Sequence, residues 1–262
     1  MKIISLQPSV SIILDRLGCL DTIAACTKYC VNAVPALREH NLPLVRDSWS
    51  TKMDDLLPIR ADLVIASVPY REESIAAILK SGIPVLALAP HTLADIHTDI
   101  RHIARLVDAG AKGELLIVEM QSAVEAVRER TKPLLRPLVY CEEWGKPLIH
   151  SQAWVAELVQ IAGGEFLGVP GRTTSTQAVA EANPDIIIAA WCGAGNRVPL
   201  RKIIAAREWN ALSAVRQGRA YCIADELLNT PAPTLIDGLC ALARAIHPEV
   251  FGEPVEPTCS RI

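Results

Sequence analysis

The sequence predicts an α/β protein of two lobes, each built on a parallel sheet, joined by a long helical backbone. Three observations predict this fold. Short apolar strands alternate with amphipathic helices in the first third of the chain and again in the last part, and the segment between them is helical throughout. Alternation at this rhythm is typical of a doubly wound parallel sheet.

The first lobe is predicted to span residues 1–92. Each predicted strand is an apolar run that stops at polar residues or proline, and each helix has an apolar face and ends near glycine or a polar residue. The expected strands are 3–6, 22–27, 61–67 and 83–89, and the expected helices are 9–17, 53–57 and 71–80.

The helical backbone is predicted over residues 93–132. Helical periodicity runs through this segment with one break near 109–113. At ~1.5 Å per residue, the stretch 114–130 alone would be roughly 25 Å long. Pro133 and Pro137 mark its exit. A flexible linker would be rich in Gly and Ser, so this segment is predicted to be a rigid strut.

The second lobe, residues 133–262, repeats the pattern of the first. Its expected strands are 138–141, 185–190 and 219–224, and its expected helices are 154–162, 199–206 and 234–246. Two of these strands run into tryptophan, at Trp144 and Trp191. Because ligands of open α/β sheets bind beyond the carboxyl ends of the strands, we expect these indoles to form the wall of a ligand cleft.

Composition and charge exclude several classes of protein. A net charge of −3 and no run of Lys or Arg argue against nucleic-acid binding. The apolar segment 10–14 is too short to span a membrane, and the start Met1–Ser9 leads into a strand with no signal-peptide pattern, so we expect a cytoplasmic protein without membrane insertion. The eight cysteines show no zinc or redox spacing and are expected to be mostly buried, reduced thiols.

The scarce aromatic residues are the first candidates for ligand binding, since only 4% of the chain is aromatic. Indole and phenol rings at strand or loop tips supply broad apolar walls for a large flat ligand. The alternative is that they fill a seam between the lobes. Trp154 and Trp209 are expected to lie within helices and in the core. The candidates for the cleft are Tyr29, Trp49, Tyr70, Trp144 and Trp191.

Polar residues at the strand ends are the second group of candidates. Glu142 and Glu143 should point to opposite sides of their strand, which leaves one of them, Glu143, to bind ligand amides. Gln7, Ser9, Asp225 and Glu226 are further expected hydrogen-bonding residues. 

His91 and Cys192 follow strand ends, and imidazole and thiolate are good ligands for transition metals. They are candidates for an axial bond to a metal, although their spacing forms no metal motif. The alternative is a hydrogen-bonded surface histidine and a buried cysteine.

Catalytic motifs are absent: the sequence has no G-x-S-x-G, no Walker A loop and no G-x-G-x-x-G after the first strand. We therefore predict a binding protein without a catalytic cofactor. An enzyme of corrinoids or small amides, with Cys192 as nucleophile, stays an alternative.

The chain resembles the class III substrate-binding proteins of ABC importers, and within them the vitamin B12 (cobalamin) binding proteins. The phrases that carry the resemblance are 3–9, 58–65, 82–88, 93–100, 143–164, 184–193, 209–221 and 231–242. The resemblance implies two Rossmann-like lobes on a helical backbone and a ligand, such as a corrinoid, held between them.

The sequence departs from this resemblance in two ways. Members of the class are secreted or lipid-anchored, whereas no leader pattern is present. They also dock to a permease through an acidic residue on each lobe. Glu72 or Glu73 fits that role in the first lobe, but the second lobe offers Arg197, Arg201 and Lys202, so permease docking is in doubt.

The function predicted from the sequence is the binding of a cobalamin-type corrinoid or a related metal chelate. A siderophore, haem or metal-ion receptor is the alternative among binding proteins. A protein whose cleft closure signals to a partner is a third possibility.

Overall fold

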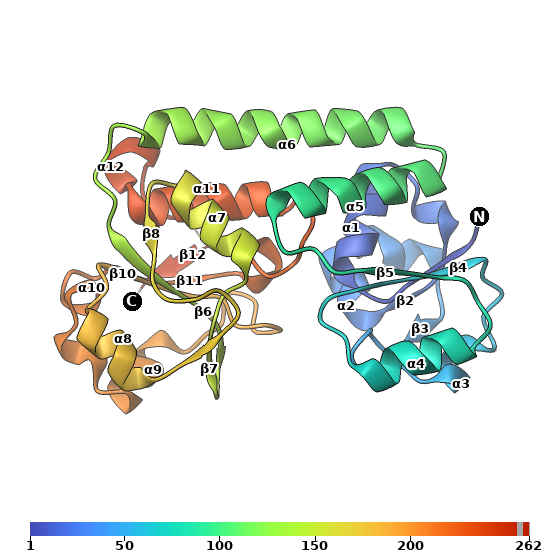
Figure 1. Ribbon diagram of the computed structural model, residues 1–262, viewed down its shortest axis with the longest axis horizontal. Coiled ribbons are helices and arrows are strands. Elements are labelled where there is room, and N and C mark those ends of the chain that lie inside the picture. Colours follow the sequence, from blue (N-terminus) through green and yellow to red (C-terminus); the bar gives the residue numbers. More distant parts are fainter. Residues whose placement is uncertain (256–258, 262) are drawn as a thin grey trace. The chain divides into compact units, whose positions relative to one another are not determined.

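The computed structural model describes residues 1–255 and 259–261. Contacts between residues divide the chain into two compact units. Unit 1 contains Met1–Glu119 and Pro231–Pro233, and unit 2 contains Met120–Thr230 and Thr234–Ile262 apart from the residues outside the description. Each unit holds one sheet with helices on both faces (Figure 1). The lobe boundaries at residues 92 and 132 stay a prediction.

The sheet of unit 1 is parallel throughout and has the strand order β3-β2-β1-β4-β5. Its central strands are runs of Ile, Val and Ala that are buried on both sides, as expected for a sheet covered on both faces. The strands are β1 (Ile3–Ser5), β2 (Ile23–Thr27), β3 (Leu44–Val45), β4 (Leu63–Ser67) and β5 (Val85–Leu88).

Helices cover both faces of this sheet. Helix α1 contacts α2 and α5, whereas α3 and α4 contact each other on the opposite face (Figure 1). Pro8 is the first residue of α1, where its missing N–H costs no hydrogen bond. The helices are α1 (Pro8–Arg16), α2 (Lys28–Ala33), α3 (Met53–Leu56), α4 (Glu72–Lys80) and α5 (Leu93–Leu106), with 3-10 helices at Leu20–Thr22 and Pro35–His40.

The long helix α6 (Gly110–Thr131) follows α5 after a short break. The predicted helical segment is therefore present, but its break lies at 107–109 rather than 109–113. Gly113 packs closely on Ala104, so that a Cβ at position 113 would overlap the Ala104 methyl group. Glycine is accepted inside α6 because α5 lies too close for any side chain.

The sheet of unit 2 is mixed, which corrects the expectation of a parallel sheet in each lobe. Its order is β12-β11-β10-β6-β7-β9, with β8 paired to β6. β10 is parallel to β6 and β11, while β7, β9 and β12 join by antiparallel pairing. The strands are β6 (Leu138–Gly145), β7 (Leu148–His150), β8 (Glu165–Phe166), β9 (Thr173–Thr174), β10 (Ile186–Ala189), β11 (Ala220–Ile223) and β12 (Cys259–Arg261).

Two helical layers sandwich this second sheet. Helices α7 and α11 contact each other on one face, and α8 and α9 lie on the other (Figure 1). On the α8–α9 face, Tyr140, Ile187 and Trp209 share one apolar cluster. The helices are α7 (Ala153–Ile161), α8 (Thr176–Ala182), α9 (Leu200–Ala206), α10 (Ser213–Arg216), α11 (Leu235–Ile246) and α12 (Pro248–Phe251), with 3-10 helices at Trp209–Ala211 and Asp225–Leu227.

Two expectations about the chain as a whole can be compared with this fold. The cysteines are mostly buried, as predicted: Cys26, Cys30, Cys141, Cys222 and Cys259 are covered, whereas Cys192 and Cys240 are exposed. Within the part of the chain that the structure describes, none of the helices combines the length and the apolar character that crossing a membrane requires.

Candidate functional site

The carboxyl edge of the unit 1 sheet gathers predicted ligand residues from all five strands. Parallel strands end at one edge, so the residues that follow them are brought together there. Gln7 follows β1, Tyr29 follows β2, Trp49 follows β3, Tyr70 follows β4 and His91 follows β5. Tyr29 lies at the tip of β2, as expected, and belongs to the first turn of α2.

Ser9 is the exception among the predicted residues of unit 1. It lies inside α1 and is buried, and its hydroxyl has no hydrogen-bond partner among the described residues. Gln7, in contrast, is half-exposed and donates from Nε2 to the carbonyl of Pro69 at 3.2 Å. This bond ties the loop after β1 to the loop after β4.

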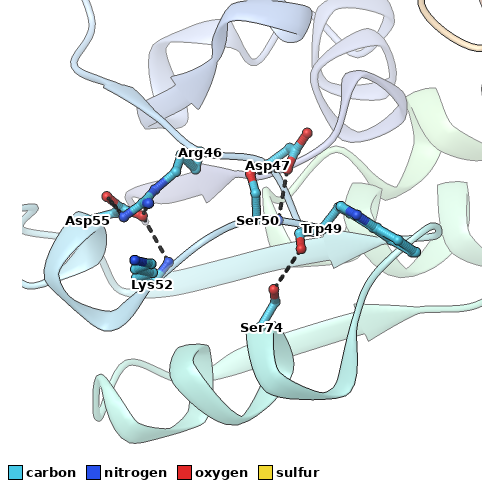
Figure 2. A network of polar contacts seen from close by, with 7 residues as sticks. All are labelled: Arg46, Asp47, Trp49, Ser50, Lys52, Asp55 and Ser74. Carbon is cyan, nitrogen blue, oxygen red and sulfur yellow. Dashed lines mark hydrogen bonds and ion pairs between the residues drawn. The ribbon is translucent and has the colours of Figure 1, made fainter.

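A hollow of about 700 Å³ opens beside Trp49. The loop after β3 and the first turns of α4 form it, and Figure 2 shows several of its residues. Trp49 is 43% exposed, a large value for an indole in a folded protein. The hollow is lined by Arg46, Trp49, Ser50, Thr51, Lys52, Arg71, Glu73, Ser74 and Ala77.

Hydrogen bonds hold this loop in shape (Figure 2). The Ser74 hydroxyl donates to the Trp49 carbonyl at 2.9 Å, and Asp47 accepts from both the backbone N–H and the hydroxyl of Ser50. Arg46 binds Asp55 with two hydrogen bonds of 2.7 and 2.8 Å, and this contact lowers the pKa of Asp55. The Trp49 loop is thus preorganised before any ligand arrives.

Arg71 gives the hollow its chemical character. Its guanidinium carbon lies 4.5 Å from the centre of the Trp49 ring, in cation–π geometry. Among the described residues, no Asp or Glu forms an ion pair with Arg71. The hollow therefore offers a flat apolar face next to a cation that can meet a ligand's oxygen atoms.

The carboxyl edge of the unit 2 sheet carries the other predicted residues. Glu143 and Trp144 lie near the end of β6, Trp191 and Cys192 follow β10, and Asp225 follows β11 with Glu226 beside it. Trp144 is 42% exposed, and its indole N–H donates to the carbonyl of Lys146 in the same hairpin. Trp191 is half-buried.

Glu143 lies in a small polar cluster. Gln152 donates to Oε2 of Glu143 at 2.7 Å, and the Cys192 sulfur is 3.8 Å from Oε1. Asn229 donates to that sulfur at 3.5 Å, and its own Oδ1 is buried without a partner among the described residues. Burial raises the pKa of Glu143. The cluster presents carboxyl and amide groups, which suit the amide side chains of a ligand.

Asp225 has a structural role that the sequence did not suggest. Its two carboxylate oxygens accept the backbone N–H groups of Gly193 and Gly195, each at 2.7 Å. Both glycines have positive φ values, 78° and 58°, which strain any residue with a Cβ. Asp225 therefore fixes the turn that follows Trp191, while its neighbour Glu226 is exposed.

Glu142 points away from Glu143, as the alternation of the strand predicts, and is buried. Oε2 accepts the Tyr140 hydroxyl at 2.6 Å and Nη1 of Arg207 at 2.7 Å. Oε1 accepts the Trp191 indole N–H at 2.7 Å and Nη2 of Arg207 at 2.9 Å. Sequence reasoning missed this network, because Arg207 is 65 residues away along the chain.

The described residues provide no cluster of ligands for the predicted metal bond. Within residues 1–255 and 259–261, His, Cys, Asp and Glu side chains form no group of three that could hold a metal ion. His91 belongs to unit 1 and Cys192 to unit 2. An axial bond from either residue stays a prediction.

The reactivity of Cys192 tests the enzyme alternative. Although Cys192 is exposed as a whole residue, loss of water around its sulfur, with the nearby carboxylates of Glu143 and Asp225, raises the pKa of Cys192 to about 12. The thiolate is the nucleophile, so a higher pKa leaves less of it at neutral pH. We expect iodoacetamide to alkylate Cys192 at pH 8 at least about tenfold more slowly than N-acetylcysteine.

Peptide mass spectrometry after timed quenching measures this rate, and the Cys192→Ser variant confirms which peptide is followed. A rate that levels off by about pH 10 would show that the thiol ionises near its usual pKa of about 8.5 and would contradict the expectation.

The acidic residues considered for permease docking, Glu72 and Glu73, are exposed in the first turn of α4. Arg201 and Lys202 are exposed on α9, and Arg197 precedes that helix. The two units thus present opposite charges at these positions. Docking to a permease stays a prediction.

Comparison with known proteins places this geometry in context. A family model described as periplasmic binding protein matches residues 3–227. The uncharacterized ABC transporter substrate-binding lipoprotein YvrC of Bacillus subtilis is 24% identical, with 96% of this chain and 82% of YvrC covered. A cobalamin-binding protein of Halobacterium salinarum is 20% identical, with 94% and 69% covered.

Among solved structures, a periplasmic heme binding protein from Pseudomonas aeruginosa superposes with a TM-score of 0.86 at 18% identity, covering 99% of this chain and 97% of that one. At this identity the likeness establishes the fold and leaves the ligand open.

Proposed function

Because this chain belongs to the periplasmic binding protein family, we propose that it binds a cobalamin-type corrinoid or a related metal chelate. Proteins of this family bind small molecules and are not enzymes. The proposal draws support from the relatives named for cobalamin, and above all from one observation: tryptophans stay exposed at the carboxyl edge of each sheet.

The exposed indoles suit a large, flat ligand. If the ring of Trp49 buries ~100 Å² against the ligand, at ~25 cal/mol/Å² the contact contributes roughly 2.5 kcal/mol before association costs. Glu143, Gln152 and Asn229 supply polar groups of the kind that bind corrin amides. Haem is the second candidate, and the cation of Arg71 beside Trp49 favours it, since haem carries two carboxylates.

Titration of the purified full-length protein tests the proposal. Cyanocobalamin or hydroxocobalamin is expected to quench tryptophan fluorescence and to shift the corrin absorption bands, and hemin serves as the probe for the second candidate. Trp49→Ala is expected to weaken binding by up to about 70-fold, the equivalent of the contact above. Leu135→Ala, at a residue that is 91% exposed, is the control and should bind like the wild type.

Unchanged fluorescence and absorption at high concentrations of all three probes would overturn the proposal. Binding of hemin alone would assign the site to haem.

The cellular location is a separate proposal. We propose the cytoplasm, and the several buried thiols agree with a reducing compartment. Fractionation of the native host with an antibody against the protein tests this, and recovery in a membrane or extracytoplasmic fraction would contradict it.

A further inference from the structure

Three contacts hold the indole of Trp191. Its N–H donates to the buried carboxylate of Glu142 at 2.7 Å. Its six-membered ring lies against Gly145, so closely that a Cβ at position 145 would overlap the ring. Apolar residues around Val198 and Cys222 pack against the same side chain. The rest of the ring remains open, since Trp191 is half-buried.

Glu142 is fully used as an acceptor. Four donor groups meet its two oxygens: the Tyr140 hydroxyl, the Trp191 N–H and two N–H groups of Arg207. The side chain of Glu142 is 1% exposed and that of Arg207 is 10% exposed. Arg207 also stacks on Trp209, 4.7 Å from the ring centre, and reaches the Gly145 carbonyl. The carboxylate therefore has one orientation in which all its partners are satisfied.

Net stability does not explain why this ion pair is buried. Removing two charges from water costs about as much as their attraction returns, and well-packed apolar residues often replace such pairs without loss. The pair does join three segments of the chain: strand β6, the loop after β10 and the end of α9. The ion pair therefore sets the relative positions of these segments. Its half-buried partner is the indole of Trp191.

We propose that Glu142 and Arg207 are positioning residues, which fix the Trp191 indole as a rigid wall of the ligand site. The inference rests on the proposed function for its binding consequence, but the orientation of the indole can be measured without any ligand. Neither residue touches the ligand in this proposal. They act through Trp191, together with Tyr140 as a further donor and Gly145 as the seat of the ring.

The test uses protein labelled with 5-fluorotryptophan, which gives one ¹⁹F resonance for each of the five tryptophans. The Trp191→Phe variant identifies the Trp191 resonance by its loss. The triple variant Tyr140→Phe, Glu142→Leu and Arg207→Met replaces the whole buried polar group with apolar side chains and leaves no charge stranded. Arg101→Met with Glu114→Leu removes an exposed, doubly hydrogen-bonded ion pair of unit 1 and is the matched control.

In the triple variant, the Trp191 resonance is expected to move and broaden while those of Trp49, Trp144 and Trp154 stay in place. The Kd for cyanocobalamin or hemin, whichever probe the wild type binds, is expected to rise about 2- to 12-fold, the cost of immobilising one such side chain on binding. The urea midpoint is expected to stay near that of the wild type. The control should change neither the resonance nor the Kd.

An unchanged, sharp Trp191 resonance in the folded triple variant would overturn the inference. If the wild type binds neither probe, the proposed function fails and the resonance still decides the positioning role. If the triple variant does not fold, Glu142→Gln replaces it, because glutamine keeps the shape but only one acceptor oxygen for four donors. Faster deuterium exchange of the Trp191 indole N–H in Glu142→Gln would support the inference, and an unchanged rate would refute it.

Discussion

Replacing Glu142 by alanine is expected to lower the free energy of unfolding by about 3–5 kcal/mol, because it leaves the guanidinium of Arg207 buried without its counter-charge. The variant also leaves the Tyr140 hydroxyl, which is fully buried, without an acceptor. Urea unfolding followed by tryptophan fluorescence is a suitable measurement, since four of the five tryptophans belong to unit 2.

Glu114→Ala is the matched control for this prediction. Glu114 also binds an arginine, Arg101, through two hydrogen bonds, but its side chain is half exposed. Water replaces the lost partner there, so we expect a much smaller loss of stability than in Glu142→Ala. Similar losses in the two variants would show that Arg207 finds water or another acceptor, contrary to the expected effect of burial.

Replacing Trp154 by alanine is expected to cost about 3–5 kcal/mol of stability, since the change opens a cavity in the core of unit 2. Trp154 is only 3% exposed, and its indole N–H donates to the buried carbonyl of Leu228 at 2.7 Å. Both the packing and that hydrogen bond disappear in the variant. Urea unfolding monitored by the remaining tryptophans and by circular dichroism measures the loss.

Trp144→Ala tests whether an exposed tryptophan contributes less to stability than the buried Trp154. Its side chain is 42% exposed, so the same substitution should change stability by about 1 kcal/mol or less. It should instead weaken binding of the probe ligand. A large loss of stability in Trp144→Ala, with unchanged affinity, would assign Trp144 to the core and remove it from the candidate site.

Much of the fold could be predicted from local sequence patterns. The strands at 63–67 and 186–189 are short apolar runs with clear ends, and the core positions of Trp154 and Trp209 follow from their helical context. The edge of the second sheet could not be predicted in this way. β12 lies near the end of the chain and pairs antiparallel with β11. A segment of three residues carries no local pattern that predicts which strand it will pair with.

The site residues that lie at strand ends could be predicted. Contacts between residues far apart in the chain could not. Tyr70 and Trp191 follow predicted strands, so their place at a carboxyl edge could be inferred from order along the chain. Trp49 follows β3, a strand of two residues that was not predicted. Ser9 follows the same rule but faces inward, because α1 begins at Pro8 and turns its side chain into the core. Strand alternation separates Glu142 from Glu143, but only the fold shows that Glu142 meets Arg207.

The turn after β10 has a consequence for reactions at Cys192. Two neighbouring backbone N–H groups that point at one place are a typical receptor for a phosphate or for the oxyanion of an acyl intermediate. Here the chain supplies its own anion, since Asp225 already occupies both donors. Any phosphate would have to displace the Asp225 carboxylate, which is covalently tethered to the chain. If the Cys192 sulfur attacked an acyl group, the oxyanion of the tetrahedral intermediate would find no free N–H at Gly193 or Gly195 to stabilise it. Asp225 thus shapes the turn and also prevents these two N–H groups from binding a phosphate or an oxyanion.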